Sequence, residues 1–364
     1  MYDVIIIGGG CSGLALAYAL CDRQQPLNVL ILDARTSYTH DKTWCFFTNT
    51  PSPWTHLAQK SWDGWSYHHN SSDCTITHTS KTWRYYYLPS ERYYQHTLAR
   101  INRSSHVTLK LGQSVTSVDR ASETVFTNDA SYQATYIVDT RPPTHPPHIL
   151  SQVFYGVYIP QHHSFSIDYV SLMHHMRSDT CGFRFNYVLP VDDNTMLFEH
   201  TRFSTTPYSK SHMQSECYSE LKRLDISYTT QYKDEYGVLP MGYNGLSTLT
   251  NGGLRAGLLR QSTGYGFLRI QAWAQSLALR LTQQPSTKQR FSLINWMDKL
   301  FLQTLRADMT KCPQYFMTLA KRCPADTLVR FLSDQATTYD CVRVMLSLPP
   351  GSFVHTLATK SRSL

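Results

Sequence analysis

The first 33 residues carry the feature that most constrains the fold. A β-branched apolar run, residues 2–7, leads directly into a glycine turn that fits GxGxxG, and a stretch of helical periodicity follows. A second apolar run, residues 29–32, ends at Asp33. In this order the glycines let the backbone approach a pyrophosphate, and the carboxylate can accept hydrogen bonds from a ribose. The predicted dinucleotide-binding residues are Gly8, Gly10, Ser12, Gly13 and Asp33.

The chain of 364 residues is long enough for two or three domains. Residues 1–150 are predicted to form a Rossmann-like domain, with an aromatic-rich insertion at about 40–100. Alternating segments in 151–245 predict an antiparallel, substrate-binding β-sheet. A second glycine-rich loop and a helix are expected over 246–285, and a helical region over 286–364. The predicted fold class is therefore α/β, with a sheet domain and a helical C-terminal part.

Composition excludes several classes of protein. Charged residues make up 16% of the chain and hydrophobic residues 41%, which excludes disordered, collagenous and coiled-coil chains. The nine cysteines are irregularly spaced and form no CxxC pair, which favours reduced thiols in the cytoplasm. The uncharged run over residues 4–21 contains four glycines and follows Asp3, so we interpret it as neither a membrane span nor a signal peptide.

The excess positive charge is concentrated near the C-terminus. The net charge is +8, and residues 288–364 hold eleven Lys or Arg against five Asp. Leu, Phe and Tyr are interleaved with these charges, and we find no nucleic-acid-binding motif. We therefore expect peripheral contact with an anionic membrane surface and no nucleic acid partner, although a solvated helical face would give the same pattern.

The glycine fingerprint does not distinguish FAD from NAD, but segments along the rest of the chain do. DKTWCFF (41–47), YYYLPSERYY (85–94), MLFEHT (196–201), EYGVLPMG (235–242) and AGLLRQSTGYGFLRIQ (256–271) occur in a characteristic order. With them the chain resembles the bacterial lycopene cyclase family of flavoproteins, from Tyr2 to about Leu357.

This resemblance implies a fold like that of FAD-dependent hydroxylases and geranylgeranyl reductases. It implies reduced FAD as cofactor, NAD(P)H as its reductant, and a hydrophobic polyene whose linear ends are cyclised without net redox change. Lys42 stands where family members commonly carry Arg, and Val115 is expected to meet adenine through its backbone. The remaining cofactor-binding residues implied by the resemblance are Asp139, Arg141, Gly257, Thr263, Gly264 and Tyr265.

The resemblance places Glu199 on the first Glu of the family's Glu-Glu-Thr or Glu-Asp-Thr motif, the proposed general acid. Protonating a terminal alkene requires a donor that keeps its proton until use. A carboxyl group desolvated among aromatic side chains has a raised pKa and meets this need. The residues alone favour a strand residue near a sheet edge in an ion pair with Arg184 or Arg202, and it is the resemblance that favours the acid.

His200 occupies the second acidic position of that motif and is the main departure from the family pattern. We name it as a candidate catalytic residue because a neutral imidazole can remove the final proton. The alternative is that it lies on the opposite face of the strand.

Two other functions remain open at this point. A flavin-dependent reductase or hydroxylase of an isoprenoid would consume NAD(P)H stoichiometrically, and a flavoprotein could bind isoprenoid lipid without catalysis. We expect no metal site, because His162–His163 and His174–His175 are adjacent pairs rather than an i, i+4 ligand face. The identity of the polyene, the number of ends that react and the ring type are not determined by the sequence.

Overall fold

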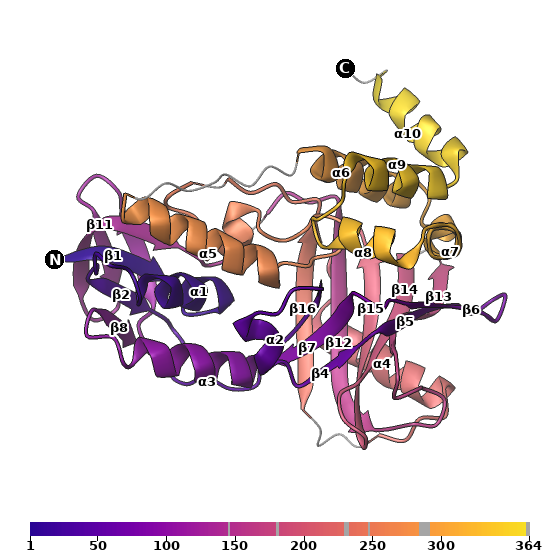
Figure 1. Ribbon diagram of the computed structural model, residues 1–364, viewed down its shortest axis with the longest axis horizontal. Coiled ribbons are helices and arrows are strands. Elements are labelled where there is room, and N and C mark those ends of the chain that lie inside the picture. Colours follow the sequence, from indigo (N-terminus) through magenta and orange to yellow (C-terminus); the bar gives the residue numbers. More distant parts are fainter. Residues whose placement is uncertain (145, 180–181, 229–232, 247, 284–291, 362–364) are drawn as a thin grey trace.

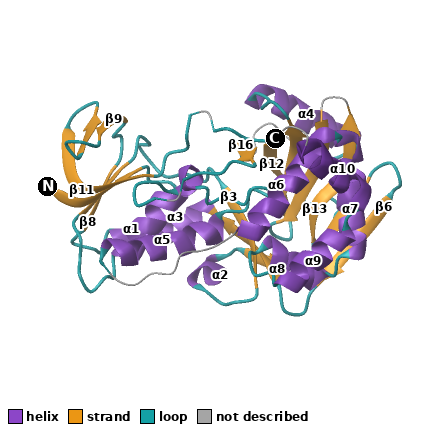
Figure 2. Ribbon diagram, turned by 90° about the horizontal axis from the view of Figure 1, so that it is seen from above, coloured by secondary structure: helices purple, strands orange, loops and turns teal. Residues whose placement is uncertain are grey.

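The computed structural model describes residues 1–364 except 145, 180–181, 229–232, 247, 284–291 and 362–364. The described residues form three sheets and a set of helices around them (Figures 1 and 2). The boundary predicted between residues 285 and 286 lies outside the described residues.

The first sheet has six strands in the order β8-β2-β1-β11-β10-β9. The four strands β8, β2, β1 and β11 pair in parallel, while β10 and β9 continue the sheet antiparallel. Helices α1 (Cys11–Leu20), α3 (Ser90–Ile101) and α5 (Phe267–Leu281) pack together beside it, and the short α2 (Pro53–Leu57) adjoins α3. The strands are β1 (Tyr2–Ile7), β2 (Val29–Leu32), β8 (Val107–Lys110), β9 (Val115–Asp119), β10 (Thr124–Thr127) and β11 (Ser131–Asp139).

Burial explains why β1 occupies the middle of this sheet. Residues 4–7 are all fully buried, because helices and the other strands cover both faces. A parallel strand covered on both faces needs a continuous apolar run, and the sequence supplies one.

The second sheet has seven strands in the order β16-β12-β15-β14-β13-β5-β6. Its strands are β5 (Gly64–His69), β6 (Cys74–Thr79), β12 (Leu150–Pro160), β13 (Val170–Asp179), β14 (Gly182–Pro190), β15 (Thr195–Ser204) and β16 (Asp234–Met241). The part formed by residues 150–241 is antiparallel, as expected. The sheet is nevertheless larger than expected, because β5 and β6 come from the aromatic-rich insertion, and β5 pairs with β13 in parallel.

A third sheet, β3-β7-β4, connects the two larger ones. It consists of β3 (Thr43–Thr48), β4 (Lys60–Trp62) and β7 (Arg84–Pro89), and the side chains of Tyr85, Tyr87 and Phe47 join the core of the second sheet. The aromatic insertion therefore supplies both the connecting sheet and the last two strands, β5 and β6, at one end of the second sheet.

Helices cover both faces of the second sheet. Helix α4 (Lys210–Arg223) packs on one face through Met213, Cys217 and Leu221. The C-terminal helices gather over the opposite side (Figures 1 and 2) and contribute Tyr315 and Val329 to its core. They are α6 (Ser292–Ala307), α7 (Cys312–Arg322), α8 (Ala325–Leu332), α9 (Thr338–Ser347) and α10 (Pro350–Ser361). Among the described residues, no helix combines the length and the apolar composition that a bilayer span requires.

Candidate functional site

The first glycine turn is possible only with glycine at two positions. Gly8 has a φ of +98°, which L side chains rarely adopt. A Cβ on Gly13 would lie 1.8 Å from the Gly8 carbonyl oxygen, so helix α1 and the end of β1 approach as closely as backbone allows. Gly10 precedes the first residue of α1, and its own Cβ would meet only the end of the Arg35 side chain, at 4.0 Å. The turn therefore has the geometry of a cradle for a pyrophosphate at a helix N-terminus.

Asp33 lies beside this turn, as its position after β2 predicts. Its Oδ2 accepts a hydrogen bond from the Gly9 N–H at 2.5 Å, and its Oδ1 accepts one from the Arg35 N–H at 2.8 Å. The carboxylate is 8% exposed and within reach of a group held by the glycine turn. Its position fits a ribose-binding acid.

A second glycine loop meets the first turn at the carboxyl ends of the parallel strands. The Gly252 N–H donates to the Asp139 carbonyl oxygen at 2.9 Å, at the end of β11. A Cβ on Gly253 would lie 2.8 Å from Oγ of Ser12, so the loop and helix α1 are in close contact. Ser12, Asp139 and the loop residues are thus brought together at the edge where dinucleotides bind in such sheets.

Asp139 and Arg141 form a two-pronged ion pair. The Arg141 Nε and Nη2 lie 3.0 and 2.9 Å from the two carboxylate oxygens of Asp139. Arg141 Nη1 also donates to the Val115 carbonyl oxygen at 3.0 Å. The expected contact between Val115 and adenine stays a prediction, and its carbonyl is already engaged by Arg141.

A cavity of about 450 Å³ lies between the second sheet, the third sheet and the C-terminal helices. Phe185, Phe203 and Phe316 give it aromatic walls, and Leu328 and Leu332 of α8 add aliphatic ones. Five residues that the sequence analysis named line this one cavity, and they are Lys42, Glu199, Thr263, Gly264 and Tyr265. The predicted loop beneath the flavin and the predicted acid therefore face the same space.

The loop that carries Thr263, Gly264 and Tyr265 is tightly turned. Gly264 has a φ of +74°, and Thr263 Oγ1 accepts a hydrogen bond from the Tyr265 N–H at 3.2 Å. Gly257, with a φ of +71°, ends the short 3-10 helix Gly253–Ala256 that leads into it. The Tyr265 hydroxyl reaches Tyr85 at 3.2 Å, and Tyr85 lies 2.5 Å from the Tyr187 hydroxyl. This tyrosine chain links the loop to the sheet next to Glu199.

Glu199 points from β15 into the cavity. In register it stands between Tyr187 of β14 and Gly156 of β12. A Cβ on Gly156 would lie 2.6 Å from Cγ of Glu199, so the glutamate side chain occupies the space that the glycine leaves free. Burial raises the pKa of the Glu199 carboxyl well above its ordinary value, and the charge of Glu235 raises it further. Burial therefore favours the protonated form of this carboxyl group.

Glu235 was not singled out from the sequence, although it begins the segment EYGVLPMG. It faces Gly156 from the other side, across the β12–β16 pair. Its Oε1 accepts hydrogen bonds from the Tyr158 hydroxyl at 2.8 Å and from Thr43 Oγ1. Only the strand register reveals that it shares a face with Glu199.

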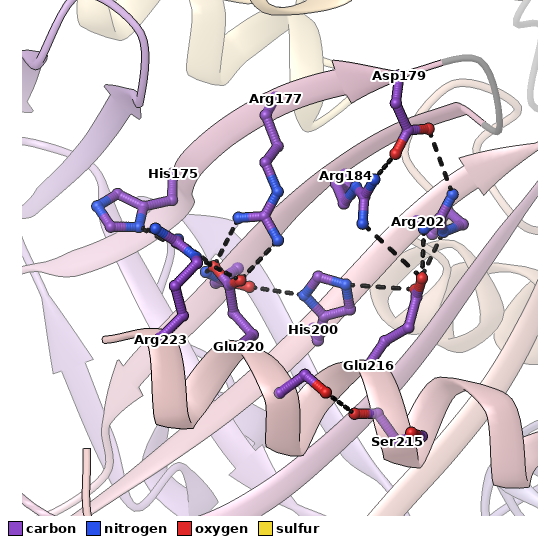
Figure 3. A network of polar contacts seen from close by, with 12 residues as sticks. His175, Arg177, Asp179, Arg184, His200, Arg202, Ser215, Glu216, Glu220 and Arg223 are labelled. Atoms are coloured by element: carbon purple, nitrogen blue, oxygen red, sulfur yellow. Dashed lines mark hydrogen bonds and ion pairs between the residues drawn. The ribbon is translucent and has the colours of Figure 1, made fainter. Parts of the chain in front are cut away.

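His200 lies on the opposite face of the sheet, as the alternative interpretation has it, so the prediction of a catalytic role beside Glu199 is wrong. Its Nδ1 is 2.8 Å from Oδ1 of Asn186. Its Nε2 lies 3.5 Å from Glu216 of α4, as Figure 3 shows for these two side chains. It is 1% exposed under α4, and burial lowers its pKa. Because adjacent strand residues point to opposite faces, a His directly after Glu199 cannot enter the same cavity.

The same face holds the arginines that could have paired with Glu199. Arg202 forms ion pairs with Glu216, and Arg184 with Asp179 (Figure 3). Both arginines are an odd number of positions from the cavity-facing residues of their strands, so they face α4. The alternative interpretation of Glu199 as an ion-paired strand residue is therefore wrong.

Three histidines that the sequence separates lie together at the β5–β13 pair. The pairing of β13 is irregular on both sides of His174, and His175 has a φ of +52°. The rings of His68, His174 and His175 consequently stack, with centroids 4.3 to 4.8 Å apart, and their nitrogen ligand atoms lie within 4.8 Å of one another. The spacing argument missed this grouping because it considered only neighbouring positions in the sequence, and His68 comes from β5, which pairs with β13.

The nitrogens of this histidine stack have other partners. Nδ1 of His175 faces Arg223 at 2.7 Å, and Nε2 of His68 faces Asp73 at 3.1 Å. Burial, the neighbouring imidazoles and Arg223 lower the pKa of His174 to about 3 despite the nearby Glu220. Burial and neighbouring charges also lower the pKa of His175, to about 4, so His174 and His175 are neutral at pH 7.

This stack predicts a loss of stability in acid. Between the ordinary histidine pKa of 6.5 and about 3, the unfolded chain binds a proton at His174 and the folded chain does not. The free energy of unfolding is therefore highest above pH 6.5 and falls as the pH decreases below it. From pH 7 to pH 5 the free energy of unfolding should fall by about 2 kcal/mol more in the parent than in His174→Gln. Urea unfolding at both pH values measures this, and equal losses in the two proteins would refute the assignment.

Comparison with known proteins places these features in a family. The family described as "Lycopene cyclase protein" matches residues 3–358. A lycopene beta-cyclase of Pseudescherichia vulneris is 24% identical over 385 residues, covering 96% of this chain and 95% of the relative. A lycopene beta-cyclase of Pantoea ananas is 23% identical over 389 residues, with the same coverage.

Solved structures show the same fold at low identity. The flavin-dependent brominase Bmp2 matches with a TM-score of 0.61 and 13% identity, covering 100% of both chains. The p-nitrophenol 4-monooxygenase PnpA from Pseudomonas putida matches with a TM-score of 0.57 and 12% identity, covering 95% of this chain and 96% of the other. The predicted fold class, a Rossmann-like FAD-binding fold with an added sheet and C-terminal helices, is confirmed.

Proposed function

Because the chain belongs to the lycopene cyclase family, we propose that it is a redox-neutral cyclase that converts the linear ends of lycopene, or of a related polyene, into β-ionone rings. The observation that carries this proposal is the position of Glu199, a buried carboxyl group that lines an aromatic cavity and whose pKa burial raises above its ordinary value. The proposed reaction is an isomerisation, with FAD as cofactor.

The reaction begins with transfer of the Glu199 proton to the terminal trisubstituted alkene, which forms a new C–H bond and leaves a tertiary cation. The electron pair of a neighbouring double bond then forms the ring bond and moves the positive charge into the ring. Loss of a ring proton leaves a cyclohexene, so one proton enters and one leaves. The carboxylate that Glu199 has become is an acceptor within the cavity.

The cavity walls suit a cation in an apolar substrate. The faces of Tyr187, Phe185 and Phe203 offer π density, which attracts positive charge without supplying a nucleophile. The apolar walls also exclude water, which would otherwise capture the cation as an alcohol.

The residues present fit FAD. The turn at Gly8 and Gly13 leaves a cradle that a Cβ would fill, and Asp33 stands beside it for the ribose. The loop at Thr263 and Gly264 would hold the flavin end next to the cavity. Bound FAD in its reduced form supplies an electron-rich ring system that stabilises nearby positive charge, and NAD(P)H is the proposed reductant.

The experiment that tests this function compares product with reductant. Purified protein is supplied with lycopene, FAD and limiting NADPH, and the pigments are separated by chromatography. A cyclase forms β-carotene or its one-ring precursor in large molar excess over NADPH consumed. Consumption equal to product would instead support the alternative, a flavin-dependent reductase or hydroxylase of an isoprenoid.

We also propose that the C-terminal helices contact a membrane surface, where a polyene substrate dissolves. On α9, Tyr339, Val342, Met345 and Leu346 are 40 to 75% exposed and recur at helical spacing, so they form one apolar stripe. Val354 of α10 is 61% exposed. The exposed Arg343 and Lys299 add positive charge, which favours anionic lipid and a peripheral, cytoplasmic location.

Replacing two of these side chains should weaken membrane binding. Leu346→Asp combined with Val354→Asp removes apolar contact area and adds negative charge, so binding to vesicles of phosphatidylglycerol should fall by about tenfold or more. Ile167→Asp is the matched control, because Ile167 is 43% exposed but lies outside the C-terminal helices. Vesicle co-sedimentation measures the effect, and equal binding by both variants would refute this surface.

A further inference from the structure

Two glutamates flank one glycine on the cavity side of the second sheet. Gly156 of β12 is paired with Glu199 of β15 on one side and with Glu235 of β16 on the other. Directly paired residues of antiparallel strands point to the same face, so both carboxyl side chains project over Gly156. Because Gly156 has no side chain, nothing from β12 stands between them.

Glu235 is held by hydroxyl groups rather than by a strong cation. It is 5% exposed and accepts hydrogen bonds from Thr43 and from Tyr158. The Tyr158 hydroxyl in turn lies 2.8 Å from Nε2 of His40 and 3.2 Å from the Tyr87 hydroxyl. Among the described residues, the basic group within 4.0 Å of Glu235 is that same His40 nitrogen, at 3.7 Å.

A buried glutamate on the α4 face of the sheet, Glu220, has different partners from Glu235. Glu220, also buried, is clamped by Arg177 and Arg223, which neutralise its charge. In the part of the chain that the structure describes, no arginine pairs with Glu235 in this way. The electric field of its negative charge therefore acts on Glu199. Hydroxyl donors fix the carboxylate in place without cancelling that field.

We propose that Glu235 is a positioning residue of the acid site, whose negative charge keeps the proton on Glu199 until substrate is bound, and that Thr43, Tyr158 and His40 hold it in place. This inference rests on the proposed function, in which Glu199 is the acid.

Removing the charge of Glu235 should lower the pKa of Glu199. Glu199 must be protonated to act, so activity is lost as the pH rises through its pKa. Glu235→Gln keeps an acceptor for Thr43 and Tyr158 but removes the charge, so the pKa of Glu199 should fall. The alkaline limb of the rate profile should move down by about one pH unit or more, a tenfold change in the protonation constant.

Infrared difference spectroscopy measures the same quantity without catalysis. The carbonyl stretch of the protonated Glu199 carboxyl is identified by its absence in Glu199→Gln, and its intensity is followed across pH in the FAD-bound protein. The expected result is a lower midpoint in Glu235→Gln and a midpoint near that of the parent in Glu235→Asp, which keeps the charge. An unchanged midpoint in Glu235→Gln would overturn the proposal.

Asp234→Asn is the matched control. It removes a carboxylate one residue away, but Asp234 bonds Tyr155 and Lys210 and faces the other side of the sheet. Its midpoint should equal that of the parent, and an equal shift in both variants would overturn a specific role for Glu235. Where Glu235→Gln fails to fold, Tyr158→Phe removes one donor to Glu235 and should also lower the midpoint, because the proton is then drawn toward Glu235.

The two readouts separate failure of this inference from failure of the proposed function. A protein that cyclises no polyene still reports the protonation of Glu199 in the infrared. A shifted midpoint without cyclase activity would support the carboxyl pair and reject the cyclase. Cyclase activity with the same pH profile and infrared midpoint in the parent and in Glu235→Gln would support the cyclase and reject the role of Glu235.

Discussion

Glu199→Gln should lower the rate of ring formation by about 10² to 10⁴-fold, the usual contribution of a positioned general acid. The amide has the size of the carboxyl and fits the space over Gly156, so the fold should not change. It has no proton of suitable acidity to give to an alkene, so the first step of the reaction stops. This is the largest effect that we expect from one substitution on activity.

The measurement is the initial rate of conversion of lycopene by the reduced, FAD-loaded variant. FAD content and the unfolding temperature should match those of the parent, which separates lost chemistry from lost structure. Glu91→Gln, an exposed carboxyl in the first turn of α3, is the matched control and should retain full activity. A Glu199→Gln variant with the parental rate would refute the acid assignment.

Arg260→Met should produce the largest loss of stability. The Arg260 guanidinium is 1% exposed and donates to both carboxylate oxygens of Asp298, at 3.0 and 3.1 Å. It also donates to the Phe331 carbonyl oxygen at the end of α8. Removing one partner of a buried pair leaves the other charge uncompensated, which costs about 3 to 5 kcal/mol.

The consequence extends to the cofactor, because Arg260 is three residues before Thr263 and ties the second glycine loop to helices α6 and α8. Chemical denaturation of the variant measures the loss of free energy of unfolding, and flavin absorbance measures retained FAD. Lys311→Met removes one partner of an exposed ion pair with Asp308 and should leave both unchanged. Parental stability in Arg260→Met would refute the structural role of this pair.

Local sequence was sufficient for the cofactor half of the molecule. The β1 run, the glycine turn and Asp33 follow one another within 33 residues. Each is constrained by short-range sterics, which depend only on residues close in the sequence. Gly13 must be glycine because α1 touches the end of β1, and that contact is built into the turn itself. The structure places these residues as predicted.

In the second sheet, the positions of the site residues depend on the register between strands. The alternation along 195–204 correctly predicted a strand, yet it could not say which face meets the cavity. A shift of one residue would exchange Glu199 for His200, and only pairing with β12 and β14 decides between them. That pairing also brings Glu235 beside Glu199 from a segment 36 positions later in the chain.

The histidine stack and the pairing of β5 and β6 could not be predicted from the sequence for a related reason. Regular strand geometry separates His174 from His175 on opposite faces, but the left-handed backbone at His175 brings them to the same side. The insertion strands β5 and β6 have no local signal that selects their partner, and β5 pairs with β13 about a hundred residues away. Contacts across such separations depend on how whole layers pack.

The sequence by itself determined the α/β class, the glycine turn at the end of β1 and the strand that carries Glu199, because short-range sterics and periodicity fix these. Tertiary structure alone decided the face on which Glu199 lies, its pairing with Glu235 across Gly156, and the removal of His200 to the far side. These depend on hydrogen-bonded register between distant strands, which places the Glu199 carboxyl group at the aromatic cavity and next to the strand that carries Glu235.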